Sequence, residues 1–270
     1  MKRGVLLIVL LILIILGLEC IGQMQIKGNL VVVFCDVGQG DGALIKTPKG
    51  QDILVDVGPD SKILKCISSY LPFWDRKIDL IILSHFNTDH VAGLIDILSR
   101  YKVERIAVST LNTDREDVGR YMQLIRTKNI ILDDLNKNDT YKIEQDLTIK
   151  TFGPNDEKYL IEDNNASLVQ MLTYKDFDVV FTGDASFEVL NPILDGLGND
   201  IEILKVPHHG SKTGLNEGSF RNFHPKVAVI SSGKGNRYGH PTKEILNLLQ
   251  ENKIQVRRTD KEGSVRFVVD

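Results

Sequence analysis

The sequence has few cysteines, little net charge and no internal repeat, and each shortage excludes a class of protein. Its three cysteines show no metal-ligand spacing, which excludes a cysteine-rich zinc module. The formal net charge of -3 argues against a surface that coats nucleic acid, although it leaves room for a local basic groove. The composition, with 42% hydrophobic and 26% charged residues, is that of a globular chain of one large or two small domains.

Two of the cysteines, Cys35 and Cys66, lie in apolar segments of the chain. We predict that they are buried free thiols. A single disulfide is the alternative if the mature chain lies outside the cytoplasm.

Long apolar runs are absent except at the N-terminus, where Val5 to Leu18 follows Lys2 and Arg3. A short basic segment before an apolar run is the layout of a secretory signal. The run is shorter than the roughly 20 residues of a comfortable membrane span. We predict that residues 1–23 are a signal peptide or an N-terminal membrane anchor. Residues 24–270 would then form one domain, secreted or membrane-anchored on the outer side of the membrane.

The remainder alternates short apolar runs with amphipathic segments in two series. Helices are predicted over Ser61–Tyr70, Val91–Leu98, Glu116–Thr127 and Thr242–Gln250. Strands are predicted over Leu30–Phe34, Ala43–Lys46, Asp52–Gly58, Leu80–Leu83, Arg105–Val108, Ile130–Leu132, Thr140–Ile143, Leu147–Phe152, Val169–Thr173, Val179–Phe181, Ile203–Val206, Ile254–Arg257 and Ser264–Val269.

Four polar residues follow the predicted strand Leu80–Leu83: His85, Asn87, Asp89 and His90. They lie on a strand-to-helix turn, and imidazole and carboxylate groups are the usual ligands of a hydrolytic metal ion. The alternative is that Asp89 only caps the helix and the histidines are incidental. Five of the six histidines in the chain fall inside such turn motifs and only His224 lies outside, which favours the metal site.

The second half of the chain supplies further candidates at strand ends. Asp184 follows a glycine after a hydrophobic strand, where its carboxylate could bridge two ions. His208 and His209 end another strand, and adjacent side chains there point in different directions, so that one can bind metal. His240 precedes a helix start, where it could act on a phosphate or a leaving oxygen. Candidate phosphate contacts near these motifs are Lys205, Lys212, Lys234 and Arg237.

The stretch Ser84-His85-Phe86-Asn87-Thr88-Asp89-His90 resembles the His-x-His-x-Asp-His signature of the metallo-β-lactamase superfamily. It is still more similar to the variant in the soluble domain of ComEC-type competence proteins, which take up DNA. The segments DVGQGD, ILVDVG, LKVPHHGS, YGHP and RRTDKEG also resemble that domain, from about Leu30 to the C-terminus. The multispanning membrane region of that family is absent, which predicts a stand-alone form. Asn87 departs from the pattern, which has His or Asp there.

The resemblance implies a four-layer αββα sandwich of two mixed β-sheets flanked by helices, with the site at one sheet edge. It implies two divalent metal ions, zinc or manganese, with magnesium also compatible. The implied metal ligands are His85, Asn87, Asp89, His90, Asp184 and one of His208 and His209. Asp89 and His240 are the implied catalytic residues. Residues implied to support the ligands or contact substrate are Asp36, Asp41, Asp56, Asn164, Asn165, Ser167 and Lys212.

The predicted function is hydrolysis of DNA outside the cytoplasm by a phosphodiesterase or nuclease that uses a metal-activated water. One alternative is a metallo-hydrolase of a small acyl substrate such as a lactam or thioester. Another is a nucleic-acid-binding module whose metal centre is impaired by Asn87. Nucleic acid is the predicted partner, with membrane attachment through the N-terminal segment, and no protein partner is inferred.

Overall fold

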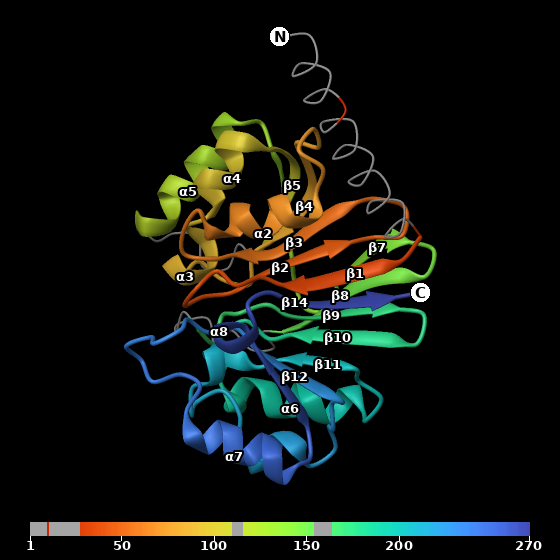
Figure 1. Ribbon diagram of the computed structural model, residues 1–270, viewed down its shortest axis with the longest axis vertical. Helices are drawn as coiled ribbons and strands as arrows, with labels where there is room; N and C mark the ends of the chain where they lie inside the picture. Colours follow the sequence, from red (N-terminus) through yellow and green to blue (C-terminus); the bar gives the residue numbers. More distant parts are fainter. Residues whose placement is uncertain (1–9, 11–27, 110–115, 154–163) are drawn as a thin grey trace.

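The computed structural model describes residue 10 and residues 28–109, 116–153 and 164–270 (Figure 1). The predicted signal or anchor, apart from Leu10, lies outside the described residues. Within them no helix is long and apolar enough to cross a bilayer. The strands of the described residues form two sheets of seven.

The first sheet has the spatial order β14 (Val265–Val269), β1 (Leu30–Phe34), β2 (Gly42–Lys46), β3 (Asp52–Val57), β4 (Lys77–Ile82), β5 (Lys102–Val108), β6 (Ile131–Asp134). The second has the order β13 (Gln255–Arg258), β12 (Val227–Ile230), β11 (Ile203–Lys205), β10 (Phe177–Phe181), β9 (Val169–Tyr174), β8 (Leu147–Gly153), β7 (Thr140–Glu144). Both sheets mix parallel and antiparallel pairs.

The central strands are apolar on both faces because each sheet is covered on both sides. In β1, Leu30, Val32 and Phe34 pack between the two sheets, whereas Val31 and Val33 pack toward the helices. Continuous runs of β-branched residues therefore suit these positions better than alternating ones. Each such fully buried aliphatic side chain contributes about 1.5–3 kcal/mol to the free energy of folding.

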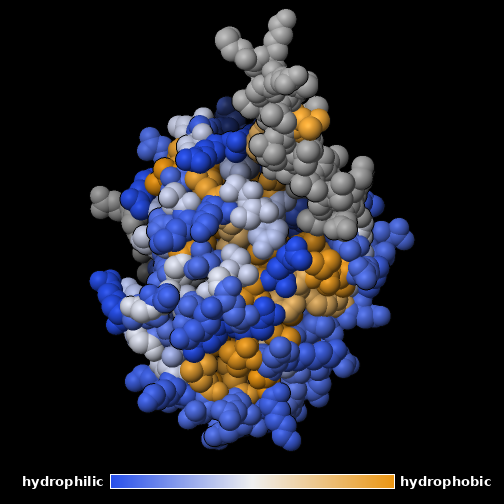
Figure 2. Space-filling view, viewed as in Figure 1, coloured by the Kyte–Doolittle hydropathy of each residue, from blue (hydrophilic) through white to orange (hydrophobic). Residues whose placement is uncertain are grey.

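Helices cover the outer face of each sheet (Figure 1). Over the first sheet lie α2 (Lys62–Tyr70), α4 (Leu94–Arg100) and α5 (Glu116–Thr127). Over the second lie α6 (Phe187–Leu197) and α7 (Lys243–Glu251). Shorter elements are α3 (Thr88–Val91), η3 (Pro207–Gly210), η4 (Glu217–Phe220) and α8 (Thr259–Glu262). The predicted αββα sandwich is thus confirmed, and Figure 2 shows hydrophilic residues over much of one face, with separate apolar patches between them.

The predicted helix Val91–Leu98 is wrong as one element, because the chain breaks between α3 and α4. A side chain at Gly93 would place its Cβ 2.1 Å from the carbonyl oxygen of Val57, so only glycine fits there. The Gly93 N–H instead donates to the Gly58 carbonyl at 2.9 Å. This contact fixes the helical turn that carries Asp89 and His90 against the end of β3.

The prediction of free thiols is also wrong. Cys35 and Cys66 form a disulfide, with their Cα atoms 5.7 Å apart. The disulfide joins the loop after β1 to α2, two segments that are 31 residues apart in the sequence. Disulfides persist in oxidising compartments, which agrees with the alternative considered above.

Candidate metal centre

Strand ends from both sheets meet at one end of the sandwich. Asp56 lies at the end of β3 and His85 follows β4, both in the first sheet. Asp184 follows β10 and His209 follows β11, both in the second sheet. Residues far apart in the sequence converge here because the β3–β4 and β10–β11 pairs are parallel.

Asp89, His90, Asp184 and His209 form a tight cluster at this end. One ligand atom from each lies within 4.8 Å of the others. His209 Nε2 is 3.1 Å from Asp89 Oδ2 and 3.5 Å from Asp184 Oδ2, and His90 Nε2 is 3.2 Å from Asp184 Oδ1. The side chains of His90, Asp184 and His209 are buried, whereas that of Asp89 is 35% exposed. Asp89 therefore stands at the mouth of the cluster.

The buried donor atoms of this cluster fit a divalent cation. Among the described residues His85 Nε2, beside the cluster, is buried without a hydrogen-bond partner, whereas His90 Nε2 and Asp184 Oδ1 are buried and face each other at 3.2 Å. Buried polar atoms are normally partnered, so the unpartnered His85 nitrogen beside this pair indicates a missing partner. Imidazole nitrogens and carboxylate oxygens are the donors that zinc and manganese take in proteins.

Asp56 fixes the position of the turn that carries His85 and His90. Its carboxylate accepts hydrogen bonds from the backbone N–H and the hydroxyl of Ser84, each at 2.7 Å, and lies 2.9 Å from His90 Nδ1. The Ser84 hydroxyl also lies 3.0 Å from His85 Nδ1. Ser84 received no role from the sequence; a hydroxyl next to the first histidine was the one available signal.

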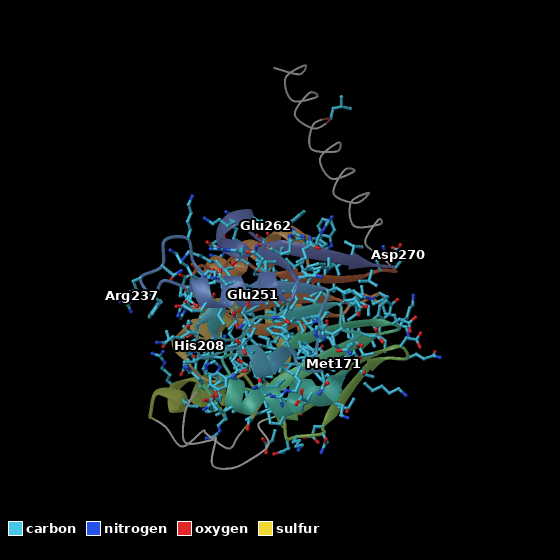
Figure 3. The ribbon with its side chains drawn as sticks, turned by 90° about the horizontal axis from the view of Figure 1, so that it is seen from below. Met171, His208, Arg237, Glu251, Glu262 and Asp270 are labelled. Atoms are coloured by element: carbon cyan, nitrogen blue, oxygen red, sulfur yellow. A yellow bond between two sulfur atoms is a disulfide. The ribbon has the colours of Figure 1, made fainter. Side chains whose placement is uncertain are left out.

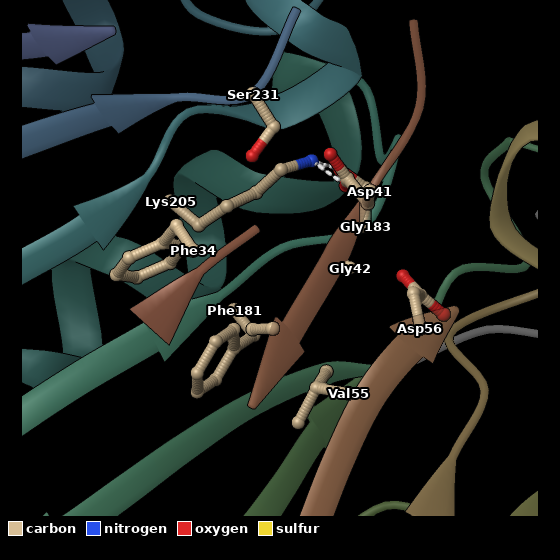
Figure 4. Close-up of a pocket in the computed structure, with 10 residues that line it drawn as sticks. Phe34, Asp41, Gly42, Val55, Asp56, Phe181, Gly183, Lys205 and Ser231 are labelled. Atoms are coloured by element: carbon tan, nitrogen blue, oxygen red, sulfur yellow. Dashed lines mark hydrogen bonds and ion pairs between the residues drawn. The ribbon is translucent and has the colours of Figure 1, made fainter. Parts of the chain in front are cut away.

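Lys205 is buried beside the cluster and forms an ion pair with Asp41 (Figure 4). Its ammonium also donates to the Gly183 carbonyl at 2.9 Å. The prediction that Lys205 contacts phosphate is therefore wrong, since only 3% of the residue is exposed. Asp41 is placed by its own N–H, which donates to the Asp89 carbonyl at 3.1 Å. Gly40 allows this approach, because a Cβ there would lie 2.3 Å from the same carbonyl oxygen.

Asp41, Asp56 and His90 form a second group of close potential ligands. We do not assign a metal to this group, because Asp41 is paired with Lys205 and Asp56 is hydrogen bonded to Ser84 and His90.

The two adjacent histidines after β11 point apart, as predicted, because both adopt the left-handed conformation, with φ of 49° and 55°. Such conformations are rare outside glycine and gather at functional sites. His209 turns into the cluster, and its Nδ1 lies 3.0 Å from the Ser231 carbonyl oxygen. His208 lies outside it, with its ring 5.7 Å from that of His240 and its Nε2 3.9 Å from Asp184. His240 Nδ1 is buried and unpartnered among the described residues.

Three of the remaining predicted residues, Ser167, Asn165 and Asn164, accept hydrogen bonds in or next to the site. Ser167 accepts a hydrogen bond from the Asp184 N–H at 3.0 Å and lies 3.3 Å from His85 Nδ1, whereas Asn165 accepts one from Ser186. Asn164 accepts a hydrogen bond from the Asn87 amide at 2.7 Å.

Two predicted supporting residues lie away from the cluster. Asp36 is exposed and its carboxylate accepts a hydrogen bond from Gly38, two residues along its own loop. Lys212 is exposed at the end of the turn that follows His209. Neither side chain is shown in contact with the cluster, and their predicted role in supporting the ligands or contacting substrate stays a prediction.

The sequence profile of the metallo-beta-lactamase superfamily matches residues 35–234, which include both halves of the cluster. The chain belongs to the metallo-β-lactamase superfamily. Its curated relatives include ComE operon protein 3 of Bacillus subtilis, 28% identical over 86% of this chain, and Recombination protein 2 of Haemophilus influenzae, 29% identical over 86%. Competence protein ComA of Neisseria gonorrhoeae is 24% identical over 89%. The aligned region spans only 28–32% of these relatives' own length.

Two solved structures share the fold of this chain. Zn(2+)-bound PqqB from Methylobacterium extorquens has a TM-score of 0.56 and 10% identity, with 88% of this chain and 99% of that chain covered. CmlA, a diiron β-hydroxylase from Streptomyces venezuelae, has a TM-score of 0.57 and 12% identity, with 90% and 54% covered. At these identities the likeness concerns the fold alone.

The titratable groups in and beside the cluster lie close enough to shift one another's pKa values. Burial and the neighbouring His90 lower the pKa of His85 to about 3. Burial opposes the charge of His209, but the carboxylates of Asp184 and Asp41 outweigh it and raise the pKa to about 9. The pKa of His90 is likewise raised against burial, by Asp184 and Asp56. The pKa of Asp89 falls to about 2, against burial, through its hydrogen bond with His209.

We expect metal binding to release about two protons at pH 7, because His90 and His209 are protonated without metal and imidazole ligates only when neutral. Since the proton competes with the metal, affinity should rise with pH until His209 deprotonates near pH 9. Calorimetric titration in two buffers of different ionisation enthalpy measures the protons released. Equal heats in both buffers would show that these histidines are neutral before binding.

Replacing Asp56 with asparagine should weaken metal binding about 10–100-fold, the usual effect of removing the partner that orients a histidine ligand. The amide keeps the size of the carboxylate but loses the charge that faces His90 Nδ1. Metal affinity is measured by competition with a chromogenic chelator, with the exposed Asp36→Asn as the matched control. Equal affinity in Asp56→Asn and Asp36→Asn would remove Asp56 from the site.

Proposed function

We propose that the protein is a metal-dependent phosphodiesterase that cleaves DNA outside the cytoplasm. The observation that carries this proposal is the buried cluster of Asp89, His90, Asp184 and His209, with the unpartnered Nε2 of His85 next to it and the His208–His240 pair beside it. The names of two relatives, Recombination protein 2 and Competence protein ComA, link them to recombination and competence, which are processes that handle DNA.

A first divalent ion would be held by Asp89, His90, Asp184 and His209. A second would take His85 and Asp184, joined by Asn87 and His208. Bound there, a divalent ion supplies Lewis-acid polarisation and lowers the pKa of water. Zinc and manganese both suit this mixture of nitrogen and oxygen donors, and magnesium suits its oxygen-rich part.

The side chains of the chain have separate tasks in this proposal. Asp56 fixes His90 through Nδ1 and leaves Nε2 facing the cluster. Asp89, exposed at the mouth, is the group best placed to accept a proton from an attacking water. Burial and the neighbouring His208 lower the pKa of His240, so its imidazole is neutral at pH 7. A neutral His240 donates a hydrogen bond to a phosphate oxygen better than it serves as a general acid.

The domain would act outside the cytoplasm, secreted or tethered by residues 1–23. The Cys35–Cys66 disulfide supports an oxidising compartment. The apolar run Val5 to Leu18 supports export or anchoring.

The deciding experiment incubates metal-free protein with single-stranded and double-stranded DNA, separately with manganese, magnesium and zinc. Metal-dependent cleavage is expected, with the active metal identified by the same panel. A chromogenic cephalosporin in parallel tests the acyl-substrate alternative. Opening of the cephalosporin without DNA cleavage would replace the phosphodiesterase by a lactamase-type hydrolase, and DNA binding without cleavage under every metal would favour a binding module.

Asn87→Asp is expected to tighten binding of the second ion by about tenfold or more, because the charge of the ligands tunes cation affinity over decades. Asn87 now donates to Asn164 and offers only a neutral amide oxygen. Calorimetry on the variant and on the exposed Asn129→Asp control separates a local effect from a general gain of charge. Unchanged affinity would mean that residue 87 does not reach the metal.

A further inference from the structure

Two aromatic side chains stand exposed on the turn between α2 and β4. Phe73 is 62% exposed and Trp74 55%, and their rings contact each other edge to face at 4.8 Å. The turn is held in place beneath them, because Leu71 is buried and the Asp75 N–H donates to the Pro72 carbonyl. Large aromatic side chains gain most from burial, so a rigid turn that presents two of them to water indicates a contact surface.

This turn lies at the end of the first sheet away from the metal centre. Strands β1, β3 and β4 run in the same direction, because β2 is antiparallel to β1 and β3 while β3 and β4 are parallel. The carboxyl ends of β3 and β4 lead to the cluster, so their starting ends lie opposite, with the aromatic turn just before β4. The last residue, Asp270, bonds Asn29 at this same end, and Figure 3 shows it across the molecule from His208.

The same end carries exposed basic side chains on the turns that begin its strands. Lys49 precedes β3, Arg76 precedes β4, Lys102 begins β5 and Lys128 precedes β6. None of the four forms an ion pair with another residue that the structure describes. Arg76 lies over the ring of Tyr101, 5.5 Å from its centre. Exposed Trp and Phe at the same end of a sheet as exposed Lys and Arg are the composition of a surface that sits at a membrane interface.

In the sequence, the apolar run Val5 to Leu18 precedes β1, which begins at this end of the sheet. Residues 19–27 separate the run from Gly28, and at no more than about 3.6 Å each they reach roughly 30 Å. If the run is retained in a bilayer, β1 therefore begins close to that bilayer, and the aromatic turn shares its end of the sheet.

We propose that Phe73 and Trp74 insert into the headgroup region of an anionic phospholipid bilayer, with the four basic side chains on its phosphates. The metal centre then faces away from the membrane, toward solvent. This assignment does not depend on the reaction that the centre catalyses.

Trp74 is the only tryptophan in the sequence, so its fluorescence reports on this turn alone. The full chain is reconstituted with vesicles of phosphatidylcholine and phosphatidylglycerol, with or without bromine on the acyl chains. We expect a blue shift and the loss of about half of the emission or more to brominated lipid, because tryptophan settles at headgroup level. Quenching by aqueous acrylamide should fall in parallel.

The matched control moves the reporter to the other end of the molecule. In Trp74→Phe combined with Tyr238→Trp, the tryptophan occupies a position that is 56% exposed beside His240. It should remain open to acrylamide and untouched by brominated lipid. Equal lipid quenching at both positions would overturn the assignment, as would a Trp74 that acrylamide still quenches fully. A blue shift without lipid quenching would also overturn it, by showing that a second copy of the chain covers the turn.

Discussion

Replacing Asp184 with alanine is expected to abolish metal-dependent hydrolysis and to weaken metal binding more than 100-fold, while the fold persists. The loss should exceed the roughly 10–100-fold cost of removing a partner that only orients a ligand. The Asp184 carboxylate faces the Nε2 atoms of both buried histidines of the cluster, at 3.2 Å from His90 and 3.5 Å from His209. The fold should survive because β10 and β11, on either side, are held by core residues such as Val180 and Leu204.

Asp178→Ala is the matched control for that variant. Asp178 begins the segment of β10 that ends at the cluster, so the two substitutions remove the same group from opposite ends of one strand. Thermal melting and circular dichroism should be similar for both variants, and only Asp184→Ala should lose activity. Full activity in Asp184→Ala would remove the residue from the site.

Replacing Lys205 with methionine should destabilise the protein by about 3–5 kcal/mol, the cost of leaving one partner of a buried ion pair alone. Methionine fills much of the lysine stem but leaves the buried Asp41 carboxylate without its ammonium partner. The Lys205 ammonium is also among the causes that hold the pKa of Asp41 below its ordinary value, against burial. A loss of this size lowers the melting temperature by on the order of 10 °C.

A double-mutant cycle tests whether the loss comes from this pair. Adding Asp41→Asn to Lys205→Met removes the unpaired charge and should recover part of the melting temperature. If the two substitutions lower stability additively, the ion pair is not what holds Lys205 in place. Lys212→Met, at an exposed position, should leave the melting temperature unchanged.

The central motif could be predicted from the sequence because its chemistry lies within a few residues. His85, Asp89 and His90 share one strand-to-helix turn, so local spacing already brings them together. Asp184 was predicted from its position after a hydrophobic strand, which matches that of the bridging Asp of the resembled superfamily; Gly183, with a φ of 51°, makes the turn before it. The sandwich was implied by the resemblance to the metallo-β-lactamase superfamily, and the two series of apolar strands agree with it.

Other features depend on contacts between distant segments, which spacing does not encode. Whether His208 or His209 enters the cluster is decided by the two left-handed residues of the turn. Lys205 was predicted to contact phosphate, but in the structure its ammonium pairs with Asp41 in the interior. The last strand, β14, belongs to the second series in sequence but pairs with β1 in the first sheet. The Cys35–Cys66 pairing likewise depends on how α2 packs against the loop after β1.

The central claim is that Asp89, His90, Asp184 and His209 hold a divalent metal ion. Calorimetric titration of the metal-free full chain with zinc and with manganese, alongside Asp184→Ala, tests it directly. We predict saturable binding of at least one ion per chain in the parent protein and its loss in the variant. Absence of binding by the parent protein with either metal, or equal binding by parent and variant, would contradict the assignment of the cluster.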